Sequence, residues 1–181
     1  IELAGYRMLS QINLTLDLYK METGKYVYLP KEVDLCQVLR VVLGDLESLA
    51  NLRGVSIKTV IDGIELVDGC VYMALTDELL INTLLSNLIK NAIEASPLGN
   101  TVSITLGKVG AGHRLSVHNM GAVPKGIRAN FFDKYVTHGK AHGTGLGTYG
   151  AKLMTESMGG AISMSTGENS GTTVTLQLPD S

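Results

Sequence analysis

The sequence predicts an α+β fold of two layers, in which helices cover one face of a mixed β-sheet. Three observations lead to this fold class. Apolar residues recur at intervals of three and four within residues 34–53, which is the spacing of an amphipathic helix. Apolar and polar residues alternate within residues 101–106 and 113–118, which is the spacing of strands. The expected order is two helices, strands, a helix, a hairpin, a long loop, a helix and a final hairpin.

Composition is typical of one folded domain. The chain has 181 residues, of which 45% are hydrophobic and 18% charged, and this excludes a disordered chain. The formal net charge of -2 gives no basic surface, so we exclude nucleic acid as a partner. No run reaches the roughly 18 apolar residues of a membrane span. Cys36 and Cys70 lie far apart without metal-ligand spacing, so we expect two reduced thiols in a cytoplasmic protein.

The first expected helix covers residues 1–22 and has apolar side chains on more than one face. Such a helix must be covered on most sides, which favours a helical bundle or a dimer contact. The alternative is a helix packed on its own domain. Because the chain starts at Ile1 inside this helix, we expect it to be part of a longer protein, for which a membrane anchor stays open.

The remaining elements are bounded by capping and turn residues. The second helix runs from Asp34, an N-cap, to Arg53, before Gly54. Residues 119–145 lack periodicity, and a loop of that length is usually functional. The other expected elements are strands at 56–61 and 71–75, a helix from Thr76 or Asp77 to about Ser96, strands at 101–106 and 113–118, a helix at 146–158, and strands at 161–165 and 172–178.

Two asparagines interrupt the apolar surface of the third helix. Asn87 and Asn91 are four residues apart and therefore share one helical face. An amide oxygen can ligate Mg²⁺, and an amide NH₂ can donate to phosphate. Taken alone, a solvated polar stripe is an equally good interpretation.

Alternating glycines precede the fourth helix. In residues 142–150 they let backbone N–H groups approach an anion, and the helix that follows points its positive end at the same place. A flexible loop is the alternative. The stretch does not follow a strand of a βαβ unit and lacks a Gly-Lys-Ser/Thr ending, so it is neither a dinucleotide-binding turn nor a P-loop. Asn119, at a strand end before Gly121, can point into a pocket, although such strand exits are common.

In this order, these elements resemble the N, first glycine, F and second glycine boxes of the GHKL superfamily. Within it, the chain is similar to the catalytic and ATP-binding domain of sensor histidine kinases, which has the Bergerat fold. Residues 131–135 resemble the F box, and Gly171 and Thr172 resemble the start of the closing strand. The likeness covers residues 28–181. Residues 1–24 resemble part of the second helix of the dimerisation and phosphoacceptor hairpin.

The resemblance implies ATP and Mg²⁺ as cofactors and assigns roles to single residues. Asn91 would ligate Mg²⁺, and Asn87 would support the phosphates from one turn earlier. Asn119 would face the adenine amino group, with Thr172 helping through a water molecule, and Gly121 would let the backbone pass close to the base. The remaining nucleotide contacts would be Val123, Lys134, Tyr135, His138, Lys140, Gly143, Thr144, Gly145, Leu146 and Gly147. A solvated charge cluster is the alternative for the three basic residues.

Two departures from the family pattern concern the first glycine box. Asn119 stands where the family has Asp, and the segment to Pro124 is one residue shorter than the common form. It matches a subtype with Asn-x-Gly-x-x-Pro. Because charge-assisted hydrogen bonds are about twice as strong as neutral ones, we expect weaker adenine binding. An amide can also flip and donate, so discrimination against guanine should soften.

A kinase is favoured over a hydrolase because Asn87 stands where GHKL ATPases have a glutamate that activates water. Glu94 lies on the other side of Asn91 and is not expected to replace it. The four histidines all lie at or after residue 113, so we expect the acceptor histidine upstream of Ile1. This chain would then bind ATP without phosphorylating itself. The expected partners are that upstream helix, a response regulator receiver domain and a second copy of the parent. The alternatives are an ATPase and a degenerate nucleotide-gated scaffold.

Overall fold

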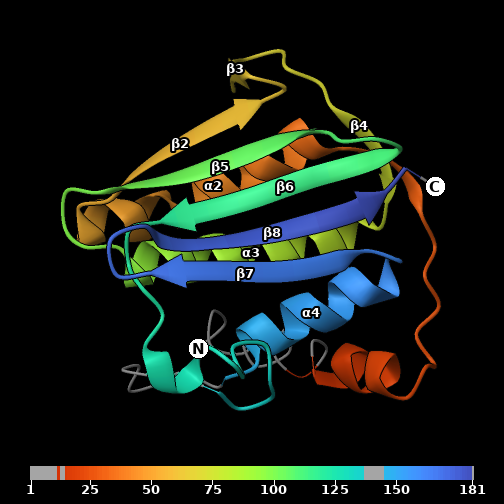
Figure 1. Cartoon of the computed structure of the whole chain (residues 1–181). Helices are drawn as coiled ribbons and strands as arrows, with labels where there is room; N and C mark the ends of the chain where they lie inside the picture. Colours follow the sequence, from red (N-terminus) through yellow and green to blue (C-terminus); the bar gives the residue numbers. More distant parts are fainter. Residues whose placement is uncertain (1–11, 13–14, 137–144, 181) are drawn as a thin grey trace, which may run out of the picture.

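The computed structural model describes residue 12 and residues 15–136 and 145–180. Six strands form the main sheet, in the order β3-β2-β5-β6-β8-β7 (Figure 1). β2 and β5 are parallel and the other neighbours antiparallel, so the sheet is mixed. The bounds are β2 Ser56–Ile61, β3 Ile64–Glu65, β5 Thr101–Lys108, β6 Gly112–Asn119, β7 Ala161–Gly167 and β8 Gly171–Pro179. The five longer strands were predicted within two residues at each end.

Helices α2 (Leu35–Arg53), α3 (Glu78–Ala95) and α4 (Gly147–Ser157) form the second layer, behind and below the sheet in Figure 1. The Asp34 and Asp77 carboxylates cap α2 and α3 by accepting backbone N–H groups of each first turn. Gly54, with φ of 60°, ends α2 in the left-handed region. These bounds and the single covered face confirm the predicted fold class.

A second, two-stranded sheet joins β1 (Lys31–Asp34) to β4 (Met73–Thr76). The strand predicted at 71–75 is therefore present but does not belong to the main sheet. β1 was not predicted because only Val33 of its four residues is buried, which leaves no alternation to detect. β3, with two exposed residues, was missed for the same reason.

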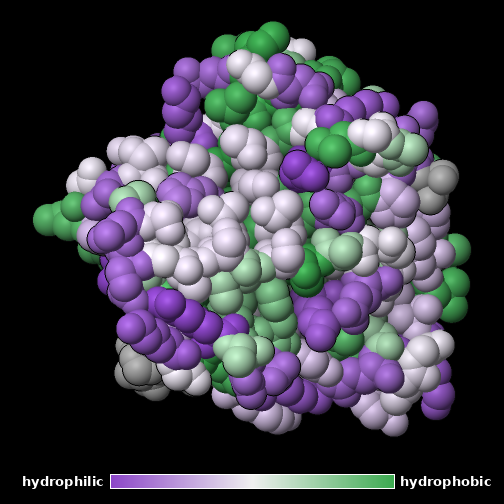
Figure 2. All heavy atoms as spheres, viewed as in Figure 1, coloured by the Kyte–Doolittle hydropathy of each residue, from purple (hydrophilic) through white to green (hydrophobic). Residues whose placement is uncertain are grey.

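The core lies between α2, α3 and the covered face of the sheet. Leu84, Leu85 and Ile89 of α3 belong to the same hydrophobic cluster as Ile104 and Leu176 of the sheet, and all are completely buried. The open face instead has short polar side chains that bond across strands, such as Ser116 with Thr175 at 3.2 Å. Figure 2 shows this face as a pale, weakly polar surface over the strands.

Residues 15–22 are helical and pack on α4 through one face. Leu18 is 4% exposed, and its Cδ2 lies 3.3 Å from the place of a Cβ on Gly150. Ile12, Leu16 and Tyr19 are each more than half exposed. The described part of this helix therefore contacts its own domain and still presents an apolar face. No helix among the described residues is long and apolar enough to cross a membrane.

The predicted irregular segment 119–145 is confirmed in its described part. It contains only the short 3-10 helix η1 (Lys125–Ile127) between turns. η1 lies at the lower left of Figure 1.

Candidate functional site

Two predicted site residues meet at one end of the sheet. Asn119 and Thr172 are cross-strand partners at the end of β6 and the start of β8. Strand alternation puts both on the helix-covered face, where their neighbours along the strands are apolar, and they are 4% and 5% exposed. Both side chains donate to the carbonyl oxygen of Gly121, Asn119 Nδ2 at 3.3 Å and Thr172 Oγ1 at 2.7 Å. Two neutral donors thus converge on one backbone acceptor.

Thr166, which the sequence analysis missed, extends this network. Its hydroxyl lies 2.8 Å from Thr172 Oγ1 and accepts the Val123 N–H at 2.9 Å. Because the Thr172 proton goes to Gly121, Thr166 must donate to Thr172. We call Asn119, Gly121, Val123, Thr166 and Thr172 the threonine network. Thr166 pairs with Thr172 across the β7–β8 hairpin, so the hairpin register was the signal that could have identified it.

Gly121 is held against the end of α3. A Cβ at Gly121 would lie only 2.0 Å from the carbonyl oxygen of Ala95 and 2.9 Å from Asn119 Nδ2. No side chain fits this space, so the residue must be glycine. The close approach fixes the exit of β6 beside the helix that carries the asparagines.

The paired asparagines lie on that helix as predicted. Asn87 and Asn91 are both half-buried. The Asn91 amide nitrogen is 3.5 Å from the place of a Cβ on Gly147, the first residue of α4. The asparagine face of α3 therefore borders the N-terminus of α4. Glu94 of α3 lies 4.0 Å from the Lys90 ammonium.

Gly145 and Tyr135 are in backbone contact close to the same helix start. The Tyr135 N–H donates to the Gly145 carbonyl oxygen at 3.1 Å. Gly145 has φ of 65°, and a Cβ there would lie 2.4 Å from the Tyr135 carbonyl carbon. Tyr135 itself has φ of 66° and is exposed. Leu146 is the N-cap residue of α4. His138, Lys140, Gly143 and Thr144 lie outside the described residues.

Lys134 bonds a partner that is distant in sequence. Its ammonium donates to Glu22 Oε1 at 2.6 Å, and the Tyr149 hydroxyl donates to the same oxygen at 2.6 Å. The ammonium also lies 5.5 Å from the centre of the Tyr149 ring. We call these three residues the Lys134 cluster. It joins the N-terminal helix to the F-box segment and α4.

The pKa values of the cluster follow from these contacts. The hydrogen bonds from Lys134 and Tyr149 hold the pKa of Glu22 below its usual value of 4.5. The same carboxylate raises the pKa of Lys134 and, with burial second, raises the pKa of Tyr149 to about 12. Lys134 is therefore charged and paired at neutral pH.

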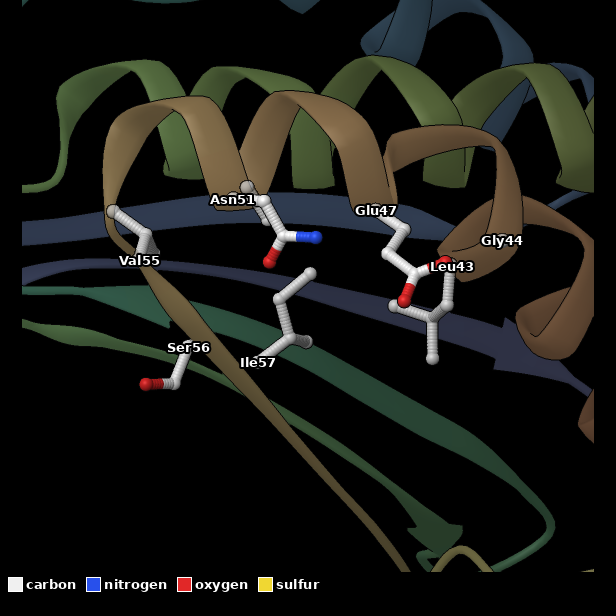
Figure 3. Close-up of a pocket in the computed structure, with 8 residues that line it drawn as sticks. Leu43, Gly44, Glu47, Asn51, Val55, Ser56 and Ile57 are labelled. Carbon is white, nitrogen blue, oxygen red and sulfur yellow. The ribbon is translucent and has the colours of Figure 1, made fainter.

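A groove between α2 and β2 lies away from these residues. It is lined by Leu43, Glu47, Asn51, Val55 and Ile57, among others (Figure 3). None of the predicted site residues lines it. Its one carboxylate would repel phosphate, so this groove does not fit the chemistry that the site residues predict.

Comparisons with known proteins agree with this fold. The family described as histidine kinase-, DNA gyrase B- and HSP90-like ATPases matches residues 76–181, which is more than half of the chain. The chain therefore belongs to this ATPase family.

Among curated relatives, the sensor histidine kinase ZraS of Escherichia coli is 39% identical over 103 residues, covering 55% of this chain and 21% of ZraS. The sensor histidine kinase WalK of Bacillus subtilis is 29% identical, covering 96% of this chain and 28% of WalK. The chain is homologous to parts of these kinases and spans less than a third of their length.

Solved structures share the fold. The histidine kinase AdeS of Acinetobacter baumannii has a TM-score of 0.78 at 19% identity, covering 98% of this chain and 81% of that chain. Full-length ShkA in complex with AMPPNP has the same TM-score at 24% identity, covering 97% of this chain and 36% of that chain.

Proposed function

We propose that this chain is the ATP-binding catalytic domain of a sensor histidine kinase of the Asn-x-Gly-x-x-Pro subtype. In this proposal the parent protein transfers the γ-phosphoryl group of ATP to its own histidine, and a response regulator receives it. The observation that carries the proposal is the neutral Asn87 one turn before Asn91, on the face that borders α4. The sensor kinases among its relatives support the same activity.

Adenine would be recognised at the threonine network. A group beside the Gly121 carbonyl oxygen must be a donor, and this sets the Asn119 amide with its nitrogen toward Gly121. This hydrogen bond therefore opposes a flip of the Asn119 amide, which would weaken discrimination between adenine and guanine. The Asn119 oxygen is left as the acceptor for the adenine amino group. Among the described residues, this oxygen accepts no hydrogen bond. Thr172, whose proton is already used, would accept from a bridging water.

The shorter first glycine box gives a physical reason for Asn119. Here the Gly121 carbonyl oxygen lies within reach of the residue-119 side chain, so that side chain must donate. A carboxylate at this place would face a carbonyl oxygen without a proton between them. We infer that the asparagine and the shortened segment belong together.

The asparagines of α3 fit a magnesium ion that arrives with the nucleotide. Mg²⁺ usually keeps several waters and takes only one or two protein ligands beside the phosphates. Within the described part of the chain, no group of three or more His, Cys, Asp or Glu could hold a metal ion by itself. Asn91 would supply one amide oxygen, and the bound ion would neutralise phosphate charge. Asn87 would donate to phosphate, and the backbone at Gly145, Leu146 and Gly147 would contact it at the start of α4.

Transfer is favoured over hydrolysis because a neutral amide, Asn87, stands where a hydrolase of this superfamily would need its general base. Asn87 cannot accept a proton from water. Glu94 follows Asn91 by three residues instead of preceding it by one turn, and it lies 4.0 Å from the Lys90 ammonium. Bound ATP should therefore persist until an acceptor side chain reaches it.

The acceptor would belong to the helix that precedes residues 1–24 in the parent. His113 is 3% exposed and bonds the Tyr72 hydroxyl at 2.9 Å, and His118 bonds Thr173 on the open face. Neither lies beside Asn91. The apolar face formed by Ile12, Leu16 and Tyr19 supports a dimer, in which a second copy of the helical hairpin covers it.

The test uses γ-labelled Mg-ATP with this chain alone, with the parent protein, and with Asn91→Ala in both. We expect binding to the chain, phosphohistidine only in the parent, and loss of label with Asn91→Ala. Exposed Asn130→Ala is the matched control and should label normally. Steady phosphate release without phosphohistidine would establish an ATPase instead. Absence of nucleotide binding would establish a scaffold.

A further inference from the structure

Two cysteines that are 34 residues apart in sequence meet outside the candidate site. Cys36 Sγ and Cys70 Sγ lie 2.7 Å apart, and both thiols are free. Cys36 is the second residue of α2 and is completely buried. Cys70 lies in the loop between β3 and β4 and is only half-buried. The pair therefore has one inaccessible thiol and one that reaches the surface.

The surrounding backbone holds the two thiols together. The Asp34 carboxylate accepts both the Cys36 N–H at 3.0 Å and the Tyr72 N–H at 2.9 Å. The Leu35 N–H donates to the Tyr72 carbonyl oxygen at 2.8 Å. Both segments are thus fastened on either side of the sulfur contact, and closing a bond between the sulfurs needs no change of fold.

A side chain of α2 fastens the loop at a second point. Arg40 Nη2 donates to the carbonyl oxygens of Val67 and Cys70, at 3.0 and 2.9 Å. The Cys70 N–H in turn donates to the Val67 carbonyl oxygen. The loop that carries Cys70 is therefore held on α2 from both ends.

We propose that Cys36 and Cys70 are an oxidation site, which a peroxide or a small-molecule disulfide converts into a disulfide between α2 and the loop at residues 66–72. Two thiols are too few ligands for a structural zinc ion. No group of three or more metal-binding side chains occurs among the described residues. The chemistry that remains for a contacting dithiol is two-electron oxidation.

The two cysteines have different parts in the reaction. Burial, followed by the hydrogen bond to Cys70, raises the pKa of Cys36 to about 12, so Cys36 stays a thiol. Cys70 attacks the peroxide oxygen, the O–O bond breaks, and one water leaves. The Cys36 sulfur then attacks the sulfenic sulfur of Cys70, the S–O bond breaks, and the Cys36 proton leaves with hydroxide as a second water. Two thiols are oxidised, and one peroxide is reduced to two waters. With a small-molecule disulfide, Cys70 attacks one of its sulfurs and the other half leaves as a thiol; Cys36 then attacks the Cys70 sulfur of the mixed disulfide, and the second half leaves as a thiol that takes the Cys36 proton.

The cysteine pair lies toward the end of α3 opposite the threonine network. Cys36 follows β1, which pairs with β4, and β4 leads through Asp77 into the start of α3. Gly121 touches Ala95 at the other end of α3. This helix of 18 residues is about 27 Å long. Oxidation should therefore crosslink α2 to the loop at residues 66–72 without blocking the candidate site. No part of this proposal rests on ATP binding.

The test treats the whole chain with hydrogen peroxide or oxidised glutathione, then alkylates it after unfolding. We expect both alkylation sites to be lost together, and a peptide that joins Cys36 to Cys70. The melting temperature should rise by roughly 5–10 °C, reversed by dithiothreitol, because the bond closes a loop of the unfolded chain. A Cys70 adduct that leaves Cys36 free for alkylation would overturn the proposal, and so would a disulfide between two chains.

Two single variants separate the roles. With Cys70→Ser, whose hydroxyl replaces a half-buried thiol, Cys36 should resist both oxidants. With Cys36→Ala, oxidation by glutathione should stop at a mixed disulfide on Cys70. Oxidation of Cys36 in the Cys70→Ser variant would overturn the assigned order. If Cys36→Ala does not fold, the wild type and Cys70→Ser decide the question alone.

Discussion

The threonine network and the Lys134 cluster are built in opposite ways. The network is neutral, with Asn119, Val123 and Thr172 buried and the other two members half-buried, and its members belong to neighbouring strands and to the turn after β6. The cluster is charged and partly exposed, and its key pair spans 112 residues of sequence. Strand register fixes the first before any ligand arrives. Packing of the N-terminal helix on α4 fixes the Lys134 cluster. A phosphate could displace the Glu22 carboxylate from Lys134.

The contrast indicates different roles for the two regions, with the threonine network selecting the base and the Lys134 cluster adjusting affinity. A closed neutral network is suited to hold one base edge in one orientation, because its donors and acceptors are already matched. A surface ion pair contributes little stability and exchanges easily. We therefore expect changes in the network to affect folding and base choice, and changes in the cluster to affect affinity and its dependence on salt.

Gly121→Ala should give the largest effect. The added methyl group would meet the Ala95 backbone at 2.0 Å, so α3 and the β6 exit must separate. We expect a loss of about 3 kcal/mol in the free energy of unfolding, measured by urea denaturation, together with loss of ATP binding. Gly126→Ala is the control, because a Cβ there meets nothing within 4 Å. Equal stability of the two variants would break the claim that the network is rigid.

Asn119→Asp should come second, and it should harm the protein although Asp is the usual family residue. The carboxylate cannot donate to the Gly121 carbonyl oxygen, so we expect a loss of about 1–2 kcal/mol in unfolding free energy and weaker ATP binding. Asn130→Asp adds the same charge at an exposed position and is the control. It should change neither the unfolding free energy nor the affinity for ATP. Tighter ATP binding by Asn119→Asp, measured by calorimetry, would contradict the proposed match between asparagine and the short segment.

Glu22→Gln should have a smaller effect of opposite sign. It frees the Lys134 ammonium, so affinity for Mg-ATP should rise by roughly two- to fivefold at low salt and less at high salt. Asp17→Asn, which removes the neighbouring pair with Lys20, is the control and should leave affinity unchanged. An unchanged or lower affinity of Glu22→Gln would show that Lys134 does not reach phosphate.

The difference in Mg-ATP affinity between wild type and Glu22→Gln should depend on pH through the ionisation of Glu22. The pKa of Glu22 is lowered, so its pairing is complete above the usual value of 4.5 and is lost as pH falls through the lower folded value. The ratio of the Mg-ATP affinities of Glu22→Gln and wild type should therefore stay constant near neutral pH. The difference should vanish only below 4.5. A difference that fades near pH 6.5, the usual pKa of histidine, would implicate a histidine instead.

The smallest effect concerns Tyr149. Its pKa of about 12 depends first on the Glu22 hydrogen bond, so this stabilisation is complete below the usual tyrosine value of 10.0 and lost as pH rises through 12. In Glu22→Gln, one tyrosine should titrate closer to 10.0 when followed by tyrosinate absorbance. An unchanged titration curve would show that Tyr149 does not bond Glu22 in solution.

The sequence predicts the local features better than the distant contacts. Periodicity and caps identified α2, α3 and the long strands, and the paired asparagines do lie on one face of α3. Thr166 was missed because its role depends on register across a hairpin. Glu22 and the Cys36–Cys70 contact were missed because only tertiary packing brings these side chains together. β1 and β3 are too short and too exposed to carry an alternation.

The most direct test of the preformed network is a calorimetric comparison of Mg-ATP and Mg-GTP binding to the unmodified chain. If Gly121 holds the Asn119 oxygen as an acceptor, the guanine carbonyl oxygen would face another acceptor. An unpaired polar group costs about 1–3 kcal/mol, so ATP should bind roughly 5- to 150-fold more tightly than GTP. Equal affinities would contradict the account, because Asn119 would then either flip freely or not face the base.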